Sequence, residues 1–209
     1  MSGERLPATR LDLLRARREL RRVRHGAALV RRKREALVAE LFRAARPALD
    51  LRDRITRATT DAARTLLEAL AEHGRSGLAA MAHPARAVEV SLKPAVVWGI
   101  PVSDVVDRDP VSRSLDARGT VPAMTGPAAA RAAACFERLT DLLVEAAPRE
   151  QRVRRLGDAV ARTSRQMRTL EQRVAPRLEG QITKVRRQLE EREREDRIRL
   201  KRFRSNSGR

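Results

Sequence analysis

The sequence has few aromatic residues: its 209 residues include three Phe, one Trp and no Tyr. Aromatic side chains supply much of the apolar area of globular cores, and the stacking platforms that bind single-stranded nucleic acid depend on them. The apolar residues present are mostly Leu, Ala and Val, which build a narrow helical seam more readily than a globular core. We therefore expect no enclosed cleft and no surface for stacking bases.

Cysteine and long apolar runs are also scarce. Cys135 is the single cysteine, so no intramolecular disulfide can form, and its neighbours Ala132, Ala133 and Phe136 favour a packed thiol over a reactive one. No stretch of 18 apolar residues is present, which excludes a direct membrane span. The N-terminus lacks the apolar core of a signal peptide, and we expect a cytosolic protein.

The residue patterns of catalysis are missing as well. His25, His73 and His83 are scattered, and none has a Cys, His or acidic partner at metal-ligand spacing. The sequence has no GxxxxGK[ST] loop, no GxGxxG turn and no recognisable nucleophile motif. We expect no catalytic residues, no metal site and no cofactor.

Two long helix-forming runs stand at the two ends of the chain, each with apolar residues in alternating steps of three and four. The first run contains Leu13, Ala16, Leu20, Val23, Ala27, Val30, Leu37 and Leu41, and is broken only at Arg34. The second contains Val153, Leu156, Val160, Met167, Leu170 and Val174, with Thr163 at one seam position. Because such a stripe is buried only by a second helix beside it, we predict a mainly α protein built on a long antiparallel two-helix coiled coil.

Between the runs the composition changes, and three segments follow. Residues 1–73 are the predicted N-terminal long helix, which starts near Thr9. Residues 74–127 are an insert with a short β-hairpin, indicated by β-branched runs at 88–92 and 95–98, and an irregular segment. Residues 128–209 form the C-terminal helical arm with a polar tail. Pro47 and Pro148 are expected to kink or break their helices.

Beyond Val174 the apolar residues change their spacing. Val174, Leu178 and Ile182 follow one another at steps of four, which unwinds a left-handed supercoil locally. Pro176 lies in this stretch, and we expect a bent but continuous helix there.

The net charge is +19, almost all of it from arginine. Between Arg15 and Arg34 ten basic residues accompany one acid, Glu19, which predicts attraction to a polyanion or to an acidic protein surface. Near the C-terminus acids alternate with bases, as in Glu193 and Arg197, which indicates a self-paired helix surface. A coiled-coil scaffold and a basic nucleic-acid-associated protein remain alternatives to a long helical protein that binds an acidic protein partner. Nucleic-acid binding is disfavoured because few aromatic side chains are present to stack on bases.

Two residues have two interpretations each. Gly26, inside a helix, is either a glycine that the long helix tolerates without a specific role or a point where the backbone of the paired helix approaches closely. Trp98 is either the small core of the insert or an exposed anchor for a partner.

Several segments in order resemble one family, the D subunits of the archaeal and bacterial A/V-type rotary ATPases. The N-terminal segments are Thr9-Arg10-Leu11-Asp12-Leu13-Leu14 and the run from Gly26 to Leu37, which contains Arg31-Arg32-Lys33-Arg34. The C-terminal segments are Arg165-Gln166-Met167-Arg168-Thr169-Leu170-Glu171, Pro176-Arg177-Leu178-Glu179 and the acidic-basic run from Leu189. The insert contributes Gly99-Ile100-Pro101-Val102. Arg168 departs from the asparagine usual in the family.

The resemblance implies a non-catalytic central-stalk rotor that carries torque for ATP synthesis or proton or other ion transport. The coiled coil would sit in a ring of catalytic A and non-catalytic B subunits, with the F and C subunits of the stalk linking it to the membrane rotor ring, on the cytoplasmic side of the membrane. The residues expected to contact partners are Arg31, Arg32, Lys33, Arg34, Arg165, Arg168, Arg177, Trp98 and Ile100. Those expected to pack helix against helix are Leu20, Val23, Gly26, Ala27, Val30, Met167, Leu170, Val174 and Leu178.

Overall fold

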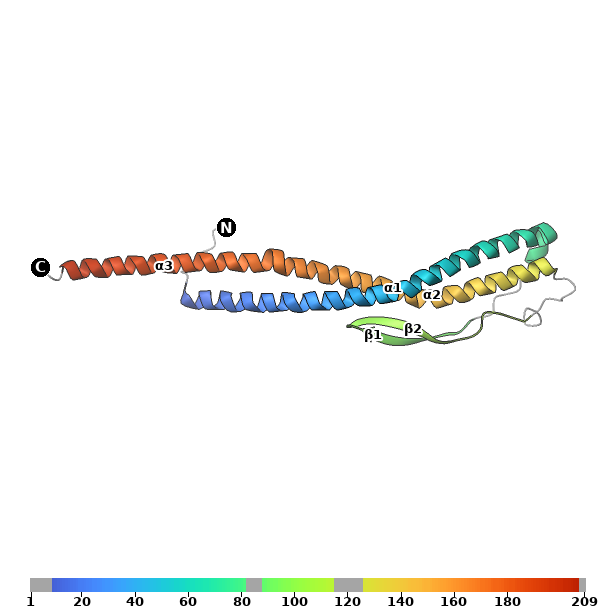
Figure 1. Ribbon diagram of the computed structural model, residues 1–209, viewed down its shortest axis with the longest axis horizontal. Helices are drawn as coiled ribbons and strands as arrows, with labels where there is room; N and C mark the ends of the chain where they lie inside the picture. The colour runs from blue at the N-terminus through green and yellow to red at the C-terminus, as the bar shows by residue number, and fades with distance from the viewer. Residues whose placement is uncertain (1–8, 82–87, 115–125, 207–209) are drawn as a thin grey trace. The chain divides into compact units, whose positions relative to one another are not determined.

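The computed structural model describes residues 9–81, 88–114 and 126–206. Long helices dominate, as predicted, and a single two-stranded sheet accompanies them in the described ranges (Figure 1). The elements are α1 (Arg10–Met81), β1 (Val90–Val97), β2 (Ile100–Arg108), α2 (Pro127–Thr169), the π-helical turn η2 (Leu170–Val174) and α3 (Ala175–Asn206).

The chain divides into two compact units. Unit 1 comprises residues 1–35 and 161–209, and unit 2 comprises residues 36–160. Unit 1 thus holds the start of α1, the end of α2, η2 and α3, while unit 2 holds the rest of α1 and α2 together with the β-hairpin.

In unit 1, α1 runs antiparallel to η2 and α3, as the ion pairs between them show. Arg10 pairs with Glu193, Arg24 with Glu179, and Arg31 with Glu171. The predicted apolar stripe lies between the helices: Ala27 and Leu178 are buried, and most other stripe residues are half-buried. The coiled coil predicted from the sequence is confirmed here.

The π-helical turn accounts for the change of spacing after Val174. The ion pairs Arg24–Glu179 and Arg31–Glu171 mark off matching segments of the two helices. The segment of α1 between them advances seven residues, whereas the opposite helical segment advances eight. The backbone N–H of Ala175 donates to the carbonyl of Leu170, five residues earlier, so η2 absorbs one extra residue. The wide turn ends just before Pro176, where a regular α-helix would set the proline ring against a carbonyl four residues earlier.

In unit 2, small and aliphatic residues pack α1 against α2 in three clusters. Leu37 and Leu156 are fully buried with Ile100 and Ala159. Leu51 packs with Leu142 and Ala146. The third cluster, at the end of α1 and start of α2, is made of Ala69, Ala128 and Ala132.

The helix limits follow local sequence signals. The hydroxyl of Thr9 bonds the Asp12 carboxylate at 2.6 Å and accepts from the Asp12 N–H, a capping arrangement one residue before α1 begins. Gly74 leaves helical geometry with φ 65°, near the predicted exit, but helical structure resumes and reaches Met81. Pro47 and Pro148 lie within α1 and α2 without a break, so of the two predicted alternatives, a kink or a break, the break is excluded.

The hairpin differs from its predicted limits. The two β-branched runs belong to one strand, β1, and the segment after Trp98, expected to be irregular, forms the second strand, β2. Val97 pairs with Ile100 across a two-residue turn made by Trp98 and Gly99, both with positive φ, and the register shifts at Ser91 and Leu92. Positive φ at both central residues defines a type I′ turn, whose twist suits a hairpin.

Candidate partner-binding surfaces

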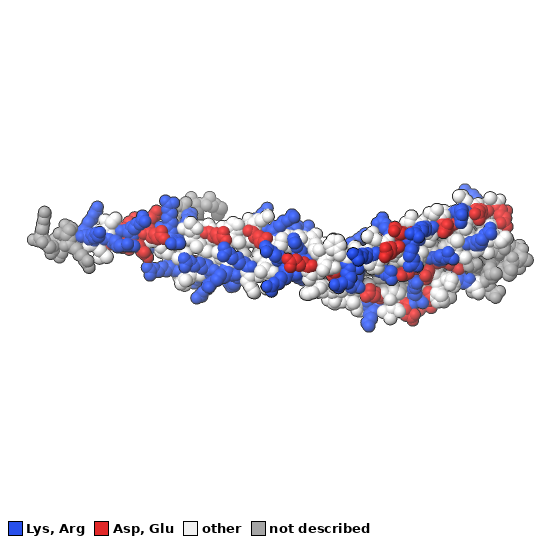
Figure 2. All heavy atoms as spheres, viewed as in Figure 1, with Lys and Arg blue, Asp and Glu red and all other residues white. Residues whose placement is uncertain are grey.

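The basic segment of α1 is only partly free of counter-charges. Arg24 and Arg31, within the segment expected to be unpaired, bond Glu179 and Glu171 of the opposite helix. The other basic residues between Arg15 and Arg34 have no ion pair within the described ranges. Figure 2 shows basic side chains gathered along this part of α1. The surface is strongly positive, but two of its guanidinium groups are already paired with acids of the opposite helix.

The four residues of the basic run from Arg31 to Arg34 differ in exposure and in pairing. Arg32 and Lys33 are exposed and lack an ion pair among the described residues, so they are available to a partner. Arg34 lies on the seam face and is half-buried, and its buried Nε has no hydrogen-bond partner. Arg31 is exposed but already paired with Glu171.

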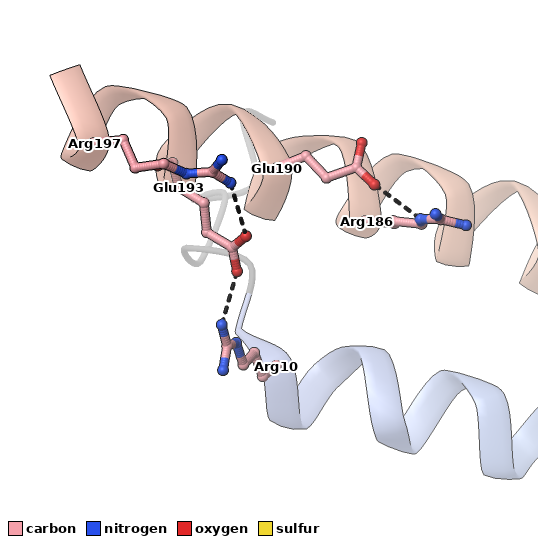
Figure 3. Close-up of polar contacts among 5 residues, drawn as sticks. All are labelled: Arg10, Arg186, Glu190, Glu193 and Arg197. Carbon is pink, nitrogen blue, oxygen red and sulfur yellow. Dashed lines mark hydrogen bonds and ion pairs between the residues drawn. The ribbon is translucent and has the colours of Figure 1, made fainter.

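The surface of α3 carries ion pairs along its own length, although the helix has 11 basic and 6 acidic residues. Arg186 donates to Glu190 at 2.9 Å, Arg187 pairs with Glu191, and Arg197 with Glu193, each four residues apart. Figure 3 shows Glu193 between Arg197 of α3 and Arg10 at the start of α1. The self-paired surface predicted for this helix is present, and it includes the expected pair of Glu193 and Arg197. The two helices of unit 1 therefore present different electrostatic surfaces.

The remaining basic residues of the prediction lie on the α2, η2 and α3 side of unit 1. Arg165, Arg168 and Arg177 are exposed, and none has an ion pair in the part of the chain that the structure describes. Their role in binding a partner stays a prediction.

The residues expected to pack the helices have graded burial. Ala27 and Leu178 are buried, whereas Leu20, Val23, Val30, Met167, Leu170 and Val174 are half-buried. Gly26 does not mark a close approach, because a β-carbon added there would have no heavy atom within 4 Å. The close-approach interpretation of Gly26 is therefore wrong.

Ile100 was expected to contact a partner, and that expectation is also wrong. Its side chain is buried in unit 2 against Leu37, Leu156 and Ala159. The apolar face of the hairpin turns Ile100 and Val102 inward because strand residues two apart lie on the same face. Ile100 anchors the hairpin to the helices.

Three arginines fix β2 to α2, and sequence reasoning missed all three. Arg155 donates to the carbonyl of Pro101 at 2.6 Å, and Arg108 reaches both the carbonyl and the carboxylate of Asp141. Arg152 lies 3.8 Å from Asp104. We call Arg108, Arg152 and Arg155 the arginine clamp. In these contacts between β2 and α2, the two partners are up to 54 residues apart in the sequence, and no local sequence pattern identifies them.

The clamp is linked to a buried carboxylate. Glu40 of α1 is 8% exposed and accepts from Arg152 at 2.9 Å and from Arg43. A buried carboxylate is tolerated only when it is paired and hydrogen-bonded, as here. Glu40 and Arg152 therefore join α1, α2 and β2 at one point.

Trp98 occupies the turn of the hairpin and is 58% exposed. The interpretation of Trp98 as the core of the insert is wrong, because the core beneath the hairpin is built from Ile100 and Val102 instead. A left-handed backbone at a bulky residue is unfavourable by about 1–2 kcal/mol.

A groove beside the hairpin is a second surface of unit 2. It encloses about 1040 Å³. Its lining comes from both helices and the hairpin. The apolar part is formed by Ala45, Ala48, Leu49, Val90, Leu92, Val105, Val144 and Ala147, and the charged side chains Arg52, Glu150, Arg154, Arg155 and Asp158 also line the groove. Leu49 and Leu92 are each 60% exposed, which is typical of a surface that another protein covers.

The described residues contain no group of three or more His, Cys, Asp or Glu side chains arranged to hold a metal ion. None of the described helices is long and apolar enough to cross a membrane.

The chain is similar to known proteins over most of its length. A family model that describes the D subunit of ATP synthase matches residues 12–205. The D subunit of the V-type ATP synthase of Anaeromyxobacter dehalogenans is 38% identical over 202 residues, 96% of each chain.

Relatives from two other organisms are similar over a comparable length. The D subunit of the V-type ATP synthase of Thermus thermophilus is 36% identical over 93% of this chain and 86% of its own length. The D subunit of the A-type ATP synthase of Pyrococcus horikoshii is 29% identical over 94% of this chain and 92% of its own. The family model covers most of the chain, and several relatives exceed 30% identity over nearly its full length, so the chain belongs to the family of ATP synthase D subunits.

Proposed function

We propose that this protein is the non-catalytic central shaft of a V/A-type ATP synthase and transmits torque between a ring of A and B subunits and the membrane rotor. The observation that carries the proposal is the charge of unit 1. Its residues include 28 Lys and Arg but 11 Asp and Glu, a net charge of +17 on a slender helix pair. A field of this strength suits a long contact with an acidic protein wall.

The asymmetry of unit 1 supports a rotor role. Among the described residues, the part of α1 in unit 1 has no ion pair within its own helix, whereas α3 has three such pairs, although both sides of unit 1 keep a positive charge. A shaft with unequal sides contacts each site of a surrounding ring differently and so favours a different conformation at each one. Coupling of this kind requires contact energies that differ between states by a few kcal/mol. Turning the shaft then moves each site through its states, while nucleotide binding and chemistry stay on the ring.

We assign stalk partners to unit 2. The groove beside the hairpin offers an exposed apolar surface for the F subunit of the stalk, and the C subunit would connect the shaft to the membrane ring. The protein would then be peripheral, on the cytoplasmic face of the cell membrane. Proton or sodium specificity would be determined by other subunits.

The test is a pair of charge-matched variants. In the first, Arg31, Arg32, Lys33 and Arg34 are changed to Gln. In the control, Arg186, Arg187, Arg194 and Arg197 of α3 are changed to Gln. We expect the first to weaken binding to the A/B ring at low salt and to reduce ion-coupled ATP hydrolysis, while the control retains both more fully.

Equal assembly and equal coupled activity in the two variants would contradict the proposed ring contact. Affinity purification with mass spectrometry distinguishes the shaft from a free-standing scaffold or a nucleic-acid-associated protein. Stoichiometric recovery of the ring subunits and the F subunit supports the shaft. Recovery of nucleic acid without them contradicts it.

A further inference from the structure

Trp98 has a backbone conformation that does not suit it. Its φ of 52° lies in the left-handed region, at the first central position of a type I′ turn, where Asn, Asp and Gly are favoured. Burial of the indole does not compensate, because the side chain is 58% exposed. A bulky residue kept in a strained and exposed position points to a role outside the fold of the isolated chain.

The exposure of Trp98 does not come from a loosely attached hairpin. Next to the turn, Ile100 is 7% exposed within the cluster formed with Leu37 and Leu156, and Val97 packs against the same cluster. One residue further along, the Pro101 carbonyl accepts a 2.6 Å hydrogen bond from Arg155. The turn is held from both sides, so the indole is presented in a fixed place.

The surroundings of Trp98 define the chemistry of whatever covers it. Residues 94–102 contain no ionisable side chain, although 35% of the chain is Asp, Glu, Lys or Arg. Val96, two residues before the indole, is 72% exposed. Apolar contacts of this kind are only weakly affected by salt, unlike contacts made by surface arginines.

We propose that Trp98 is the anchor of an apolar contact with the F subunit of the stalk and inserts its indole into an uncharged pocket on that subunit. This inference rests on the shaft function proposed above. The ring is the poorer match, because the charge of unit 1 calls for an acidic wall, whereas the turn carries no charge. Arg155 is the positioning residue that holds the turn through the Pro101 carbonyl.

The first test compares two substitutions on the same hairpin. Trp98→Asn removes the indole and installs a residue suited to the turn, while Val106→Asn, at a position 64% exposed, serves as the control. We expect Trp98→Asn to weaken binding of the purified F subunit by about 30-fold or more, as at interface hot spots. Its melting midpoint should stay within about 2 °C of the parent's or rise, since the backbone strain is relieved. Val106→Asn should bind as the parent does.

The second test uses the fact that Trp98 is the only tryptophan. The chain is labelled with 5-fluorotryptophan and assembled with unlabelled partners, so one fluorine resonance reports on this residue alone. We expect the resonance to shift and to lose its sensitivity to solvent when the F subunit is added, in low and in high salt. Arg155→Gln should broaden the resonance of the free chain and weaken binding of the F subunit without lowering the melting midpoint as a core substitution does.

The outcomes separate this inference from the shaft function. An unchanged resonance on adding the F subunit, or Trp98→Asn binding within about threefold of the parent, overturns the anchor while leaving ring binding untouched. A shift produced by the A/B ring and not by the F subunit overturns the choice of partner. Failure of the parent chain to bind any other component of the ATP synthase overturns the shaft function itself.

Discussion

Both units of the molecule are built on a pair of helices, but they differ in charge and in burial. Unit 1 has a net charge of +17, whereas unit 2, with 18 basic and 16 acidic residues, has a net charge of +2. Of the described residues that are buried, three lie in unit 1 and fifteen in unit 2. Charge is thus concentrated where burial is least.

The difference shows what a third element adds to a pair of helices. Two helices bury only the stripe between them, and most seam residues of unit 1 remain half-buried. In unit 2 the hairpin covers part of the helix pair, and Ile100 completes the cluster around Leu37 and Leu156. We infer that unit 2 supplies most of the stability and leaves the surface of unit 1 free to serve a partner.

The largest expected effect comes from matched leucine truncations in the same helix. Leu37→Ala in unit 2 removes a fully buried side chain and should lower the free energy of unfolding by about 3–4 kcal/mol. Leu20→Ala in unit 1, at a half-buried seam position, should lower it by about half as much. Urea unfolding followed by circular dichroism measures both. Equal losses would break the distinction between the two units.

Matched carboxylates test the same contrast for ion pairs. Glu40→Gln removes the buried carboxylate that pairs with Arg152 at 2.9 Å and leaves Arg152 only the longer contact with Asp104, and we expect a loss of about 2 kcal/mol in unfolding free energy. Glu179→Gln breaks the exposed pair with Arg24, for which about 0.5 kcal/mol is expected. High salt should reduce only the loss of unfolding free energy caused by Glu179→Gln, because that ion pair is exposed. A larger loss for Glu179→Gln would contradict this contrast.

Gly26 offers a smaller effect of opposite sign. The space around its α-carbon is open, so Gly26→Ala should stabilise α1 by about 0.5–1 kcal/mol through helix propensity. Thermal unfolding of the variant beside the parent measures the gain. A lower midpoint would mean that the backbones of unit 1 lie closer together than the structure shows.

The smallest effect concerns the start of α1. Hydrogen bonds from the Thr9 hydroxyl and N–H lower the pKa of Asp12 below its ordinary value of 3.8. Because the folded-state pKa is depressed, this stabilisation is present above pH 3.8 and is lost as the pH falls through the folded value. A carboxyl titration by NMR should place the Asp12 midpoint below 3.8, and Thr9→Ala should raise it. An identical midpoint in both proteins would exclude the capping interaction.

Sequence periodicity predicted the helices well because each seam depends on local spacing. The steps of three and four place Val23, Ala27 and Val30 on one face in any α-helix. The three successive steps of four from Leu170 also signalled an irregularity, but not that a π-helical turn would absorb the extra residue.

Contacts distant in sequence could not be predicted. Ile100 and Trp98 are two residues apart in an apolar run, and only the strand pairing decides that one is buried and the other exposed. The arginine clamp and the Glu40 pair depend on which helix faces lie beneath the hairpin. A basic residue such as Arg24 or Arg31 looks free in the sequence because its acid lies on the opposite helix.

If this chain is the proposed shaft, it must turn within its partners, and single-molecule rotation observes that movement. Val106→Cys in a Cys135→Ser background places one reactive thiol at an exposed position of the hairpin. A bead attached there is observed while the A/B ring is fixed to a surface and supplied with ATP. The shaft function predicts unidirectional rotation of the bead at a rate that follows ATP hydrolysis. A bead that stays fixed while the ring hydrolyses ATP would contradict it.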